Sequence, residues 1–545
     1  MSEFLFQYYP VHPTTWVYLS SLLMIGVYFK FSRFWSVRNL DLALLILLAP
    51  GLLMVHFGEQ RAWQEQTAGS DREVADGQGD AELAQSIESE PVGPSELDSG
   101  VPQPGVAIIA EPPVIDHGAN TLADELVRIE SDSDLDVAGT ADEGVIEGSE
   151  TTEPVASLSG HSIMFMGYIW LFIVLGIFLI RLLLDPTMVR RPLLEPNLST
   201  GGLAFIGCSL FVFLMANVIN SPGATVDTAG ARSADQLLSG VADADLASDL
   251  QRHGPGNAVL HSIPSFVTTP LYWEDVSPSH ARYIRTAKTM AIMSHLAIVV
   301  GIVAIGYQHF SSMKTGIGVA TLYLMLPYTS IMTGEVDHVL PAALLVWAVL
   351  TYRRPMAAGC FIGLAIGVAY YPIFLLPLWL SFYWQRGLMR FIAGVALTVG
   401  ASILSLLLVS EGISEFLSHV QRMFGIWWPK LTDLLGIWAL GWDPTYRFPI
   451  IAAFVAISFG YAIWPAQKNL GTLLSCSAVV LVGTQFWHGY GGGTYMAWFL
   501  PLTLLTIFRP NLEDRIALSV LGESWFRRRT PQLRRVDRAA FTVLR

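Results

Sequence analysis

Twelve apolar segments, each close to the roughly 20 residues that cross a bilayer as a helix, constrain this chain more than any other feature. They lie at 14–31, 40–57, 162–184, 199–219, 285–309, 315–333, 338–352, 357–384, 388–410, 448–464, 470–487 and 494–508. Hydrophobic residues make up 52% of the sequence and charged residues only 14%, against about 25% in a soluble protein. The sequence therefore predicts an all-α, polytopic transmembrane helix bundle.

The segment 357–384 predicts a turn at membrane depth rather than one long helix. Lys and Arg residues in short loops mark the cytoplasmic side of a membrane protein. A single helix would separate Arg386 and the tail 509–545, which carries nine Arg residues, from the other basic loops. A turn at Tyr370-Tyr371-Pro372 keeps every basic cluster on one side. The result is about 12–13 membrane segments, with the N-terminus outside and the C-terminus in the cytoplasm, and the shortest segments shielded by their neighbours.

These segments divide the chain into six parts. In order, they are an N-terminal transmembrane hairpin (1–57), an acidic extracytoplasmic loop (58–161), a second transmembrane hairpin (162–219), an extracytoplasmic loop (220–284), a transmembrane core (285–508) and a basic cytoplasmic tail (509–545).

The acidic loop accounts for the negative charge of the whole chain. The formal net charge is −13, yet residues 59–153 alone hold 24 Asp or Glu against three Arg. This loop is poor in aromatic residues and predicts a disordered segment, because it cannot bury enough apolar surface to fold. The basic residues elsewhere lie at helix ends and form no aromatic and basic surface, so the sequence excludes nucleic acid as a partner. Membrane lipid is expected to surround the apolar helices.

The polar cluster Gly334-Glu335-Val336-Asp337-His338 is the leading candidate for a catalytic site. It lies between two apolar segments, where a tight turn needs no ionisable side chains. One carboxylate of Glu335 or Asp337 could act as a general base, or the pair could hold a divalent cation, while His338 binds substrate. The alternative is a solvated helix cap at the membrane interface. No other cofactor is expected.

Other candidates are expected on the same side of the membrane. Glu274 and Asp275 are further catalytic candidates, with an exposed loop as the alternative. Lys430 and Arg447 could bind an anionic group of the substrate, although basic residues near a boundary also anchor to lipid phosphate. The Gly-rich turn 488–494 could present His488 and Tyr490 to a ligand, or its glycines could serve the turn alone.

Two sequence runs in the core resemble the GT-C superfamily of integral-membrane glycosyltransferases, and within it the bacterial mannosyltransferase-like branch. The first run, from Leu326, reads LPYTSIMTGEVDHVLPAALLVWAVLTYRRP and is similar to a helix, an outer turn and a helix returning to a basic pair. The second, from Ala357, reads AAGCFIGLAIGVAYYPIFLLPLWLSFYWQRG and is similar to a Gly-rich helix, a Tyr-Pro turn and a second helix. The last span, with its Gly-rich turn followed by Tyr495 to Pro501, is similar as well.

The chain departs from that branch at two places. Tyr370 stands where the branch commonly has a Lys before the Tyr-Pro turn. GT-C enzymes usually carry the catalytic carboxylate in the first extracytoplasmic loop, and no Asp stands out in 58–161. If the loop 220–284 is the counterpart of that first loop, Glu274 or Asp275 is the candidate base.

The resemblance implies a membrane glycosyltransferase of the bacterial inner (cytoplasmic) membrane. Such an enzyme transfers a sugar, with mannose as the candidate, from a polyprenyl-phosphate donor to an extracytoplasmic lipid or glycan acceptor. Two alternatives are a polytopic transporter or lipid-handling protein without covalent chemistry, and a structural membrane protein. The near absence of charged residues inside the apolar segments disfavours an ion-coupled transporter.

Overall fold

The structure is a computed structural model that describes most of the chain. The described residues are 12–87, 159–188, 195–221, 227–240, 253–268, 278–410, 412–424, 431–432, 434–466 and 468–510. They divide into two compact units, one of residues 1–65 with 159–545 and one of residues 66–158.

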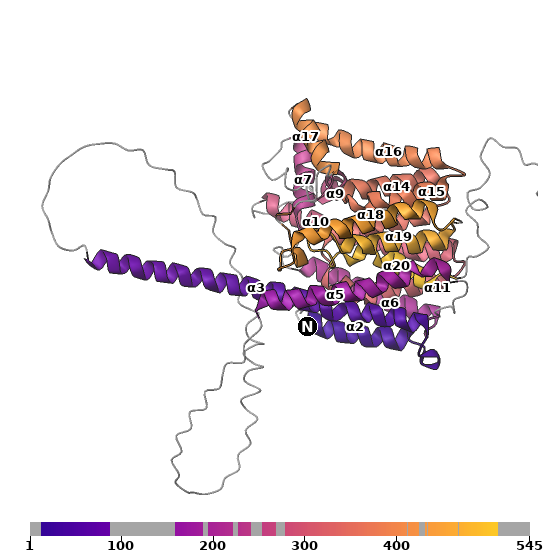
Figure 1. The fold of residues 1–545 in the computed structure, drawn as a ribbon, viewed down its shortest axis with the longest axis horizontal. Helices are drawn as coiled ribbons and strands as arrows, with labels where there is room; N and C mark the ends of the chain where they lie inside the picture. The colour runs from indigo at the N-terminus through magenta and orange to yellow at the C-terminus, as the bar shows by residue number, and fades with distance from the viewer. Residues whose placement is uncertain are drawn as a thin grey trace, which may run out of the picture. The chain divides into compact units, whose positions relative to one another are not determined.

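The described residues fold into helices, with no strand among them beyond one isolated bridge between Leu435 and Tyr490. The helices are α2 (Pro13–Tyr28), α3 (Val37–Ile87), α5 (Gly160–Leu183), α6 (Thr200–Asn220), α7 (Ala229–Ser239), α9 (Pro255–Thr268), α10 (Pro278–Gln308), α11 (Met313–Met325), α12 (Pro327–Ile331), α13 (Val336–Leu350), α14 (Pro355–Val368), α15 (Leu376–Tyr383), α16 (Leu388–Ser405), α17 (Ile413–Phe424), α18 (Arg447–Ile463), α19 (Leu470–Gln485) and α20 (Leu500–Phe508). Figure 1 shows the helices of the first unit lying side by side, with α7 and α17 at one end of them. The predicted all-α polytopic bundle is confirmed.

Long helices surround shorter ones. Six described segments, taken from α3, α5, α6, α10, α16 and α18, are long and apolar enough to cross a membrane. The shorter α19 and α20 are almost entirely buried inside the bundle. A helix too short to span can persist at membrane depth when protein surrounds it, because its free backbone ends are then shielded from lipid.

The apolar run 357–384 does break, as its basic flanks predict. Helix α14 ends at Val368 and the chain returns through the 3-10 turn Tyr371–Leu375 into α15. At the far end of α15, the hydroxyl of Tyr383 donates to the carbonyl of Tyr352 at 2.7 Å, just before α14 begins. The two helices therefore form a hairpin whose turn lies at one end of the bundle. We call this the site end; α13 begins there and α19 ends there.

Glycines let α14 and α16 approach closely. A Cβ atom added to Gly359 would lie 2.3 Å from the carbonyl oxygen of Phe391, and one added to Gly394 would lie 2.2 Å from that of Met356. Membrane helices gain no hydrophobic driving force from lipid, so close backbone contact through small residues is a main source of their association. The glycines of the 357–384 run are therefore packing residues that fix the hairpin against α16.

Charged residues close the bundle at the end opposite the site. Arg181 of α5 contacts Asp41 at 2.8 Å and Asp185 at 3.1 Å, and Asp185 contacts Arg509 at 2.7 Å. The Asp185 side chain is fully buried. The two Arg and the two Asp side chains compensate one another's charge, because a buried charge without an opposite charge beside it costs free energy.

Helix α3 differs from its expected bounds. The composition predicts an irregular loop from residue 58, but α3 continues to Ile87. Its continuation begins with good helix formers and an ion pair one turn apart, Arg61 with Glu65 at 3.2 Å. The rest of the predicted disordered loop, up to residue 158, lies outside the described residues.

Candidate functional site

A cavity of about 190 Å³ opens at the site end of the bundle. Most of its lining residues carry ionisable or hydroxyl groups. They are the carboxylates Asp227, Glu335 and Asp337, the histidines His253, His338 and His488, and the tyrosines Tyr370, Tyr371, Tyr490 and Tyr495, with Trp498, Leu435, Val368 and Ala369 completing the wall. Such a concentration of polar groups in a concave site identifies it as the candidate active site.

A histidine between two carboxylates is the chemical centre of this cavity. The Nε2 atom of His253 lies 3.2 Å from Oδ2 of Asp337 and 4.0 Å from Oδ2 of Asp227. The Asp227 side chain is 35% exposed, against 16% for Asp337. His253 and Asp337 are therefore within hydrogen-bond distance of each other, and Asp227 is the carboxylate that a ligand can reach more easily.

The loop before α7 places Asp227. The backbone N–H of Ala229 donates to its Oδ1 atom at 2.9 Å, a bond within the turn that leads into the helix. This bond holds one carboxylate oxygen and leaves Oδ2 directed at His253.

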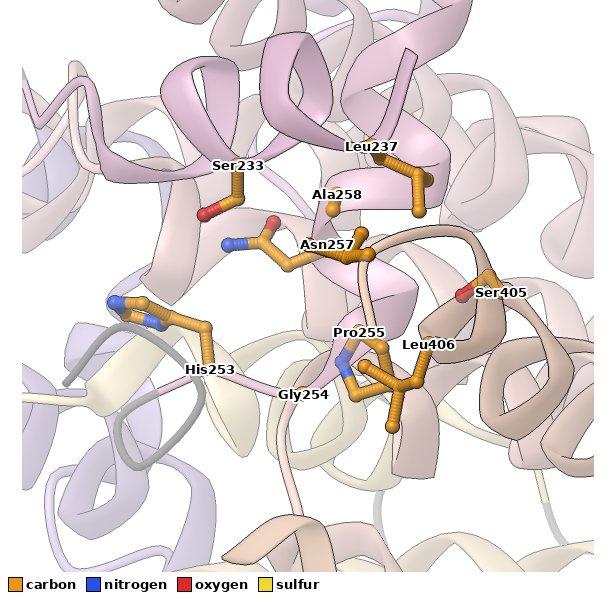
Figure 2. A pocket seen from close by; sticks show the side chains of 10 residues that line it. Ser233, Leu237, His253, Gly254, Pro255, Asn257, Ala258, Ser405 and Leu406 are labelled. Carbon is orange, nitrogen blue, oxygen red and sulfur yellow. The ribbon is translucent and has the colours of Figure 1, made fainter. Parts of the chain in front are cut away.

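Close packing of α9 against α14 places His253. The N–H of Gly254 donates to the carbonyl of Val368 at 2.9 Å, and a Cβ on Gly256 would lie 2.6 Å from the backbone of Gly367. Figure 2 shows His253 on the segment that enters α9 through Gly254 and Pro255, beside a smaller cavity lined mostly by apolar side chains. The hydroxyl of Tyr370 also donates to the carbonyl of His253, at 3.2 Å. The hairpin turn thus supports the histidine directly.

The turn between α12 and α13 places Glu335 and Asp337. Trp498 donates from its indole nitrogen to the carbonyl of Asp337 at 3.1 Å, which ties the start of α13 to the start of the last helix. Burial, followed by the charges of Asp337, Asp227 and Glu59, raises the pKa of Glu335 to about 7. Near neutral pH this carboxyl therefore exists in both protonation states, and its neutral form can donate a hydrogen bond.

Stacked rings form one wall of the cavity. The ring of His338 stacks on Tyr495 with centroids 4.2 Å apart, and Tyr495 lies 4.5 Å from His488. His488 in turn lies 4.6 Å from Tyr371. His338 is also held by the hydroxyl of Tyr328, 2.6 Å from its Nδ1 atom. This wall is rigid and offers flat apolar faces together with polar edges.

The Gly-rich turn after α19 presents His488 to the cavity. Gly491 and Gly493 have φ angles of 78° and 100°, which favour glycine. The N–H of Tyr490 donates to Nδ1 of His488 at 3.2 Å, so Nε2 carries the proton. Burial lowers the pKa of His488 to about 3, so the ring is neutral at pH 7. It can donate a hydrogen bond to a phosphate but does not supply a positive charge.

Arg447 lies directly behind that turn. Its Nε atom donates to the carbonyl of Trp487 at 3.2 Å, and a Cβ added to Gly489 would lie 3.0 Å from its guanidinium. The guanidinium also lies 6.0 Å from the ring of Trp438, which is buried. Arg447 thus brings a positive charge to the end of the cavity that contains His488.

The structure brings some predicted site residues together and leaves others undescribed. Those that line the cavity are Glu335, Asp337, His338, His488 and Tyr490, and Arg447 lies behind them. Glu274, Asp275 and Lys430 lie outside the described residues.

Asp227 and His253, which lie at the centre of the cavity, were not predicted from the sequence. Both belong to the loop 220–284, which was considered as the counterpart of the first extracytoplasmic loop of GT-C enzymes. Asp227 stands two residues before α7, and His253 precedes Gly254 and Pro255 at the start of α9, so helix-start signals in that loop could have singled them out.

One group of side chains at the described residues could hold a metal ion. Asp227, His253 and Asp337 each offer one ligand atom, and these atoms all lie within 4.8 Å of one another. The sequence pattern instead paired Glu335 with Asp337 for a cation, and Glu335 is not part of this group.

Residues 265–484 match the family model of glycosyltransferase family 87. The match covers less than half of the chain and includes Glu335, Asp337 and Arg447, while Asp227 and His253 precede it. No curated protein and no solved structure matches the chain. Together with the helical bundle, the match to family 87 supports the identification of this chain as a GT-C type membrane glycosyltransferase.

Proposed function

We propose that this protein transfers a sugar from a polyprenyl-phosphate donor to a hydroxyl group of a lipid or glycan acceptor, with Asp227 as the general base. The observation that carries the proposal is the arrangement of Asp227, His253 and Asp337 in one cavity of a chain that matches a glycosyltransferase family. Mannose is the candidate sugar, on the resemblance of the core to the bacterial mannosyltransferase-like branch.

The reaction is a displacement at the anomeric carbon of the donor. The oxygen of the acceptor hydroxyl forms the new bond to that carbon, and the bond from the carbon to the phosphate oxygen breaks. The polyprenyl phosphate leaves with the electron pair, and the hydroxyl proton passes to the carboxylate of Asp227. Atoms and charge balance without any other reactant.

Asp337 and His253 act in this proposal as positioning residues. Their contact of 3.2 Å fixes the imidazole, and the imidazole in turn stands 4.0 Å from Asp227. An imidazole held in this place limits the positions that the Asp227 carboxylate can adopt.

Arg447 and His488 are the groups we propose for the departing phosphate. Negative charge develops on the phosphate as the sugar leaves, and fixed donors aimed at that charge lower the barrier. Arg447 supplies positive charge from behind the turn 487–489, and His488 supplies a neutral N–H donor. Both residues belong to the same end of the cavity.

A donor panel tests the proposed function. The purified protein in lipid nanodiscs is incubated with radiolabelled polyprenyl-phosphate sugars and a set of alkyl glycosides as acceptors. We expect transfer from at least one donor, with polyprenyl phosphate released in equal amount. If no donor is turned over while the protein stays folded and monodisperse, the enzyme proposal is wrong.

We also propose that the site end faces away from the cytoplasm, in the bacterial inner membrane, with the N-terminus outside. The support is the position of the basic turn that contains Lys30 and Arg33. This turn lies beside the buried charges of Asp41 and Arg509, at the end of the bundle opposite the site. Basic residues in short loops mark the cytoplasmic side, so the site end faces the other way. Polyprenyl-linked donors serve acceptors beyond that membrane in the related branch.

Thiol labelling in intact bacterial cells tests this orientation. In a background with Cys208 and Cys360 replaced by Ser, two exposed positions are compared, Trp35 in the basic turn and Asp443 at the site end. We expect a membrane-impermeant reagent to label Asp443→Cys in intact cells and Trp35→Cys only after the membrane is opened. The reverse pattern would invert the proposed orientation.

A further inference from the structure

A second cavity, of about 440 Å³, adjoins the first. Helix α3 contributes His56 and Glu59 to it, helix α6 contributes Asn217, and the segment 330–335 closes its other side. Glu335 and His338 line both cavities. The two cavities are therefore neighbours that share one wall, and that wall includes the rigid ring of His338 described above.

The second cavity is lined by amide, hydroxyl and carboxyl groups. Asn217, Ser221, Ser330 and Thr333 offer amide and hydroxyl groups, and Glu59 and Glu335 offer carboxyl groups. No Lys or Arg is among its described lining residues. The nearby ammonium group of Lys288 donates to the carbonyls of Ile219 and Ser221, at 2.9 and 2.7 Å.

This chemistry distinguishes the two cavities. The first has Arg447 behind its wall and the N–H donor of His488, which suit a phosphate. The described lining of the first cavity has no Lys or Arg either, so Arg447 behind its His488 end is what separates the two. In the second, a phosphate would meet the carboxyl groups of Glu59 and Glu335, and the nearby ammonium group of Lys288 already donates to two backbone carbonyls. A neutral group with many hydroxyls can instead donate to the carboxyls and exchange hydrogen bonds with the amide and hydroxyl side chains.

We propose that the second cavity binds the acceptor of the transfer reaction, as an uncharged carbohydrate group, with Glu59, Asn217 and Glu335 among its hydrogen-bond partners. This inference rests on the proposed function. The reactive hydroxyl of the acceptor then points past Glu335 and His338, which line both cavities, toward Asp227 in the first cavity.

The proposal assigns part of acceptor recognition to helices that precede the segment matching family 87. Glu59 and Asn217 lie on α3 and α6, whereas the match begins at residue 265. Changes in these N-terminal helices should therefore alter which acceptor is used and leave donor use unchanged.

Filling the second cavity separates acceptor binding from donor binding. We compare wild type with Asn217→Trp, which places a large ring in the cavity, and with Glu59→Gln, which removes one charge and keeps the size. Ile219→Trp is the matched control, because Ile219 is on the same helix but is 61% exposed and does not line the cavity. Each variant is assayed with alkyl glycosides as acceptors, and also without any acceptor, by release of sugar from the donor to water.

We expect Asn217→Trp to raise the KM for the alkyl glycoside at least tenfold, which corresponds to about 1.4 kcal/mol of binding free energy. Donor KM and release of sugar to water should change by less than about twofold, and Ile219→Trp should resemble wild type on the same scale. Glu59→Gln should raise acceptor KM to a smaller extent.

Three outcomes would overturn the proposal. The first is an unchanged acceptor KM in Asn217→Trp, and the second is an equal loss of transfer to acceptor and to water, which would place the donor in this cavity. The third is a wild-type protein that turns over no donor, because the proposed function then fails and this inference fails with it.

Discussion

Replacing Asp227 by Asn should lower kcat for sugar transfer by about 10² to 10⁴, the usual contribution of a general base. The amide keeps the shape of the carboxylate and can still accept the N–H of Ala229, but it cannot take the proton of the acceptor hydroxyl. Donor affinity should stay within about twofold of wild type, because the proposed mechanism binds the phosphate at the other end of the cavity. Steady-state kinetics with the donor identified by the panel measure both quantities.

Asp443→Asn is the matched control for this substitution. Asp443 also accepts an N–H two residues ahead, from Thr445 at 2.9 Å, so the same backbone bond is kept or weakened in both variants. Asp443 is exposed and does not line the cavity. Its replacement should leave kcat unchanged.

Replacing Asp337 by Asn distinguishes the general base from the residue that positions it. In the proposed mechanism Asp337 acts through His253, so we expect a smaller loss of about tenfold in kcat, which corresponds to about 1.4 kcal/mol of transition-state stabilisation. If Asp337→Asn abolishes transfer and Asp227→Asn keeps most of it, Asp337 is the base and the roles of the two carboxylates are reversed.

Chelation separates a base from a metal ligand at the same residues. The three ligand atoms of Asp227, His253 and Asp337 could hold a divalent cation. We favour the base because Asp337 and His253 already lie at hydrogen-bond distance. Transfer should then persist in excess EDTA, whereas a loss that Mn²⁺ or Mg²⁺ restores would make the cluster a metal site.

The positions of the membrane helices could be predicted from the sequence because a helix that crosses lipid needs a run of about 20 apolar residues. Each of the twelve apolar segments contains a described helix, and the break at Tyr370 followed from the basic residues on both flanks. Helices α7 and α9 were not predicted. They do not need to span the bilayer, so their sequences carry no long apolar run to reveal them.

The candidate site was predictable only where its residues are close in sequence. Glu335, Asp337 and His338 stand out because three ionisable side chains occur within one short turn. Asp227 and His253 are single polar residues in a mixed loop, and only the packing of Gly254 and Gly256 against α14 brings His253 to Asp337. A juxtaposition made by tertiary packing leaves no local spacing to detect.

The same distinction applies to the buried charges at the other end of the bundle. Asp41, Arg181, Asp185 and Arg509 lie at the ends of apolar segments, where the sequence suggests exposed anchors. The structure instead buries them against one another, joining α3 and α5 to the residue that follows α20. This cluster thus connects the N-terminal helices, which precede the match to family 87, to the end of the core.

Replacing Arg181 by Gln should lower the free energy of unfolding by about 3–5 kcal/mol, because Asp41 and Asp185 would stay buried with one fewer compensating charge. Arg61→Gln is the matched control, since Arg61 pairs with Glu65 at 3.2 Å but both side chains are about 40% exposed. An exposed pair one turn apart contributes only about 0.3–0.5 kcal/mol. Equilibrium unfolding in mixed micelles measures both changes.

A second variant covers the case in which Arg181→Gln does not fold. Arg181→Lys keeps the positive charge but loses the bidentate geometry of the guanidinium, so it should show an intermediate loss of stability. Equal stabilities for Arg181→Gln and Arg61→Gln would show that the buried cluster does not hold the N-terminal helices to the core.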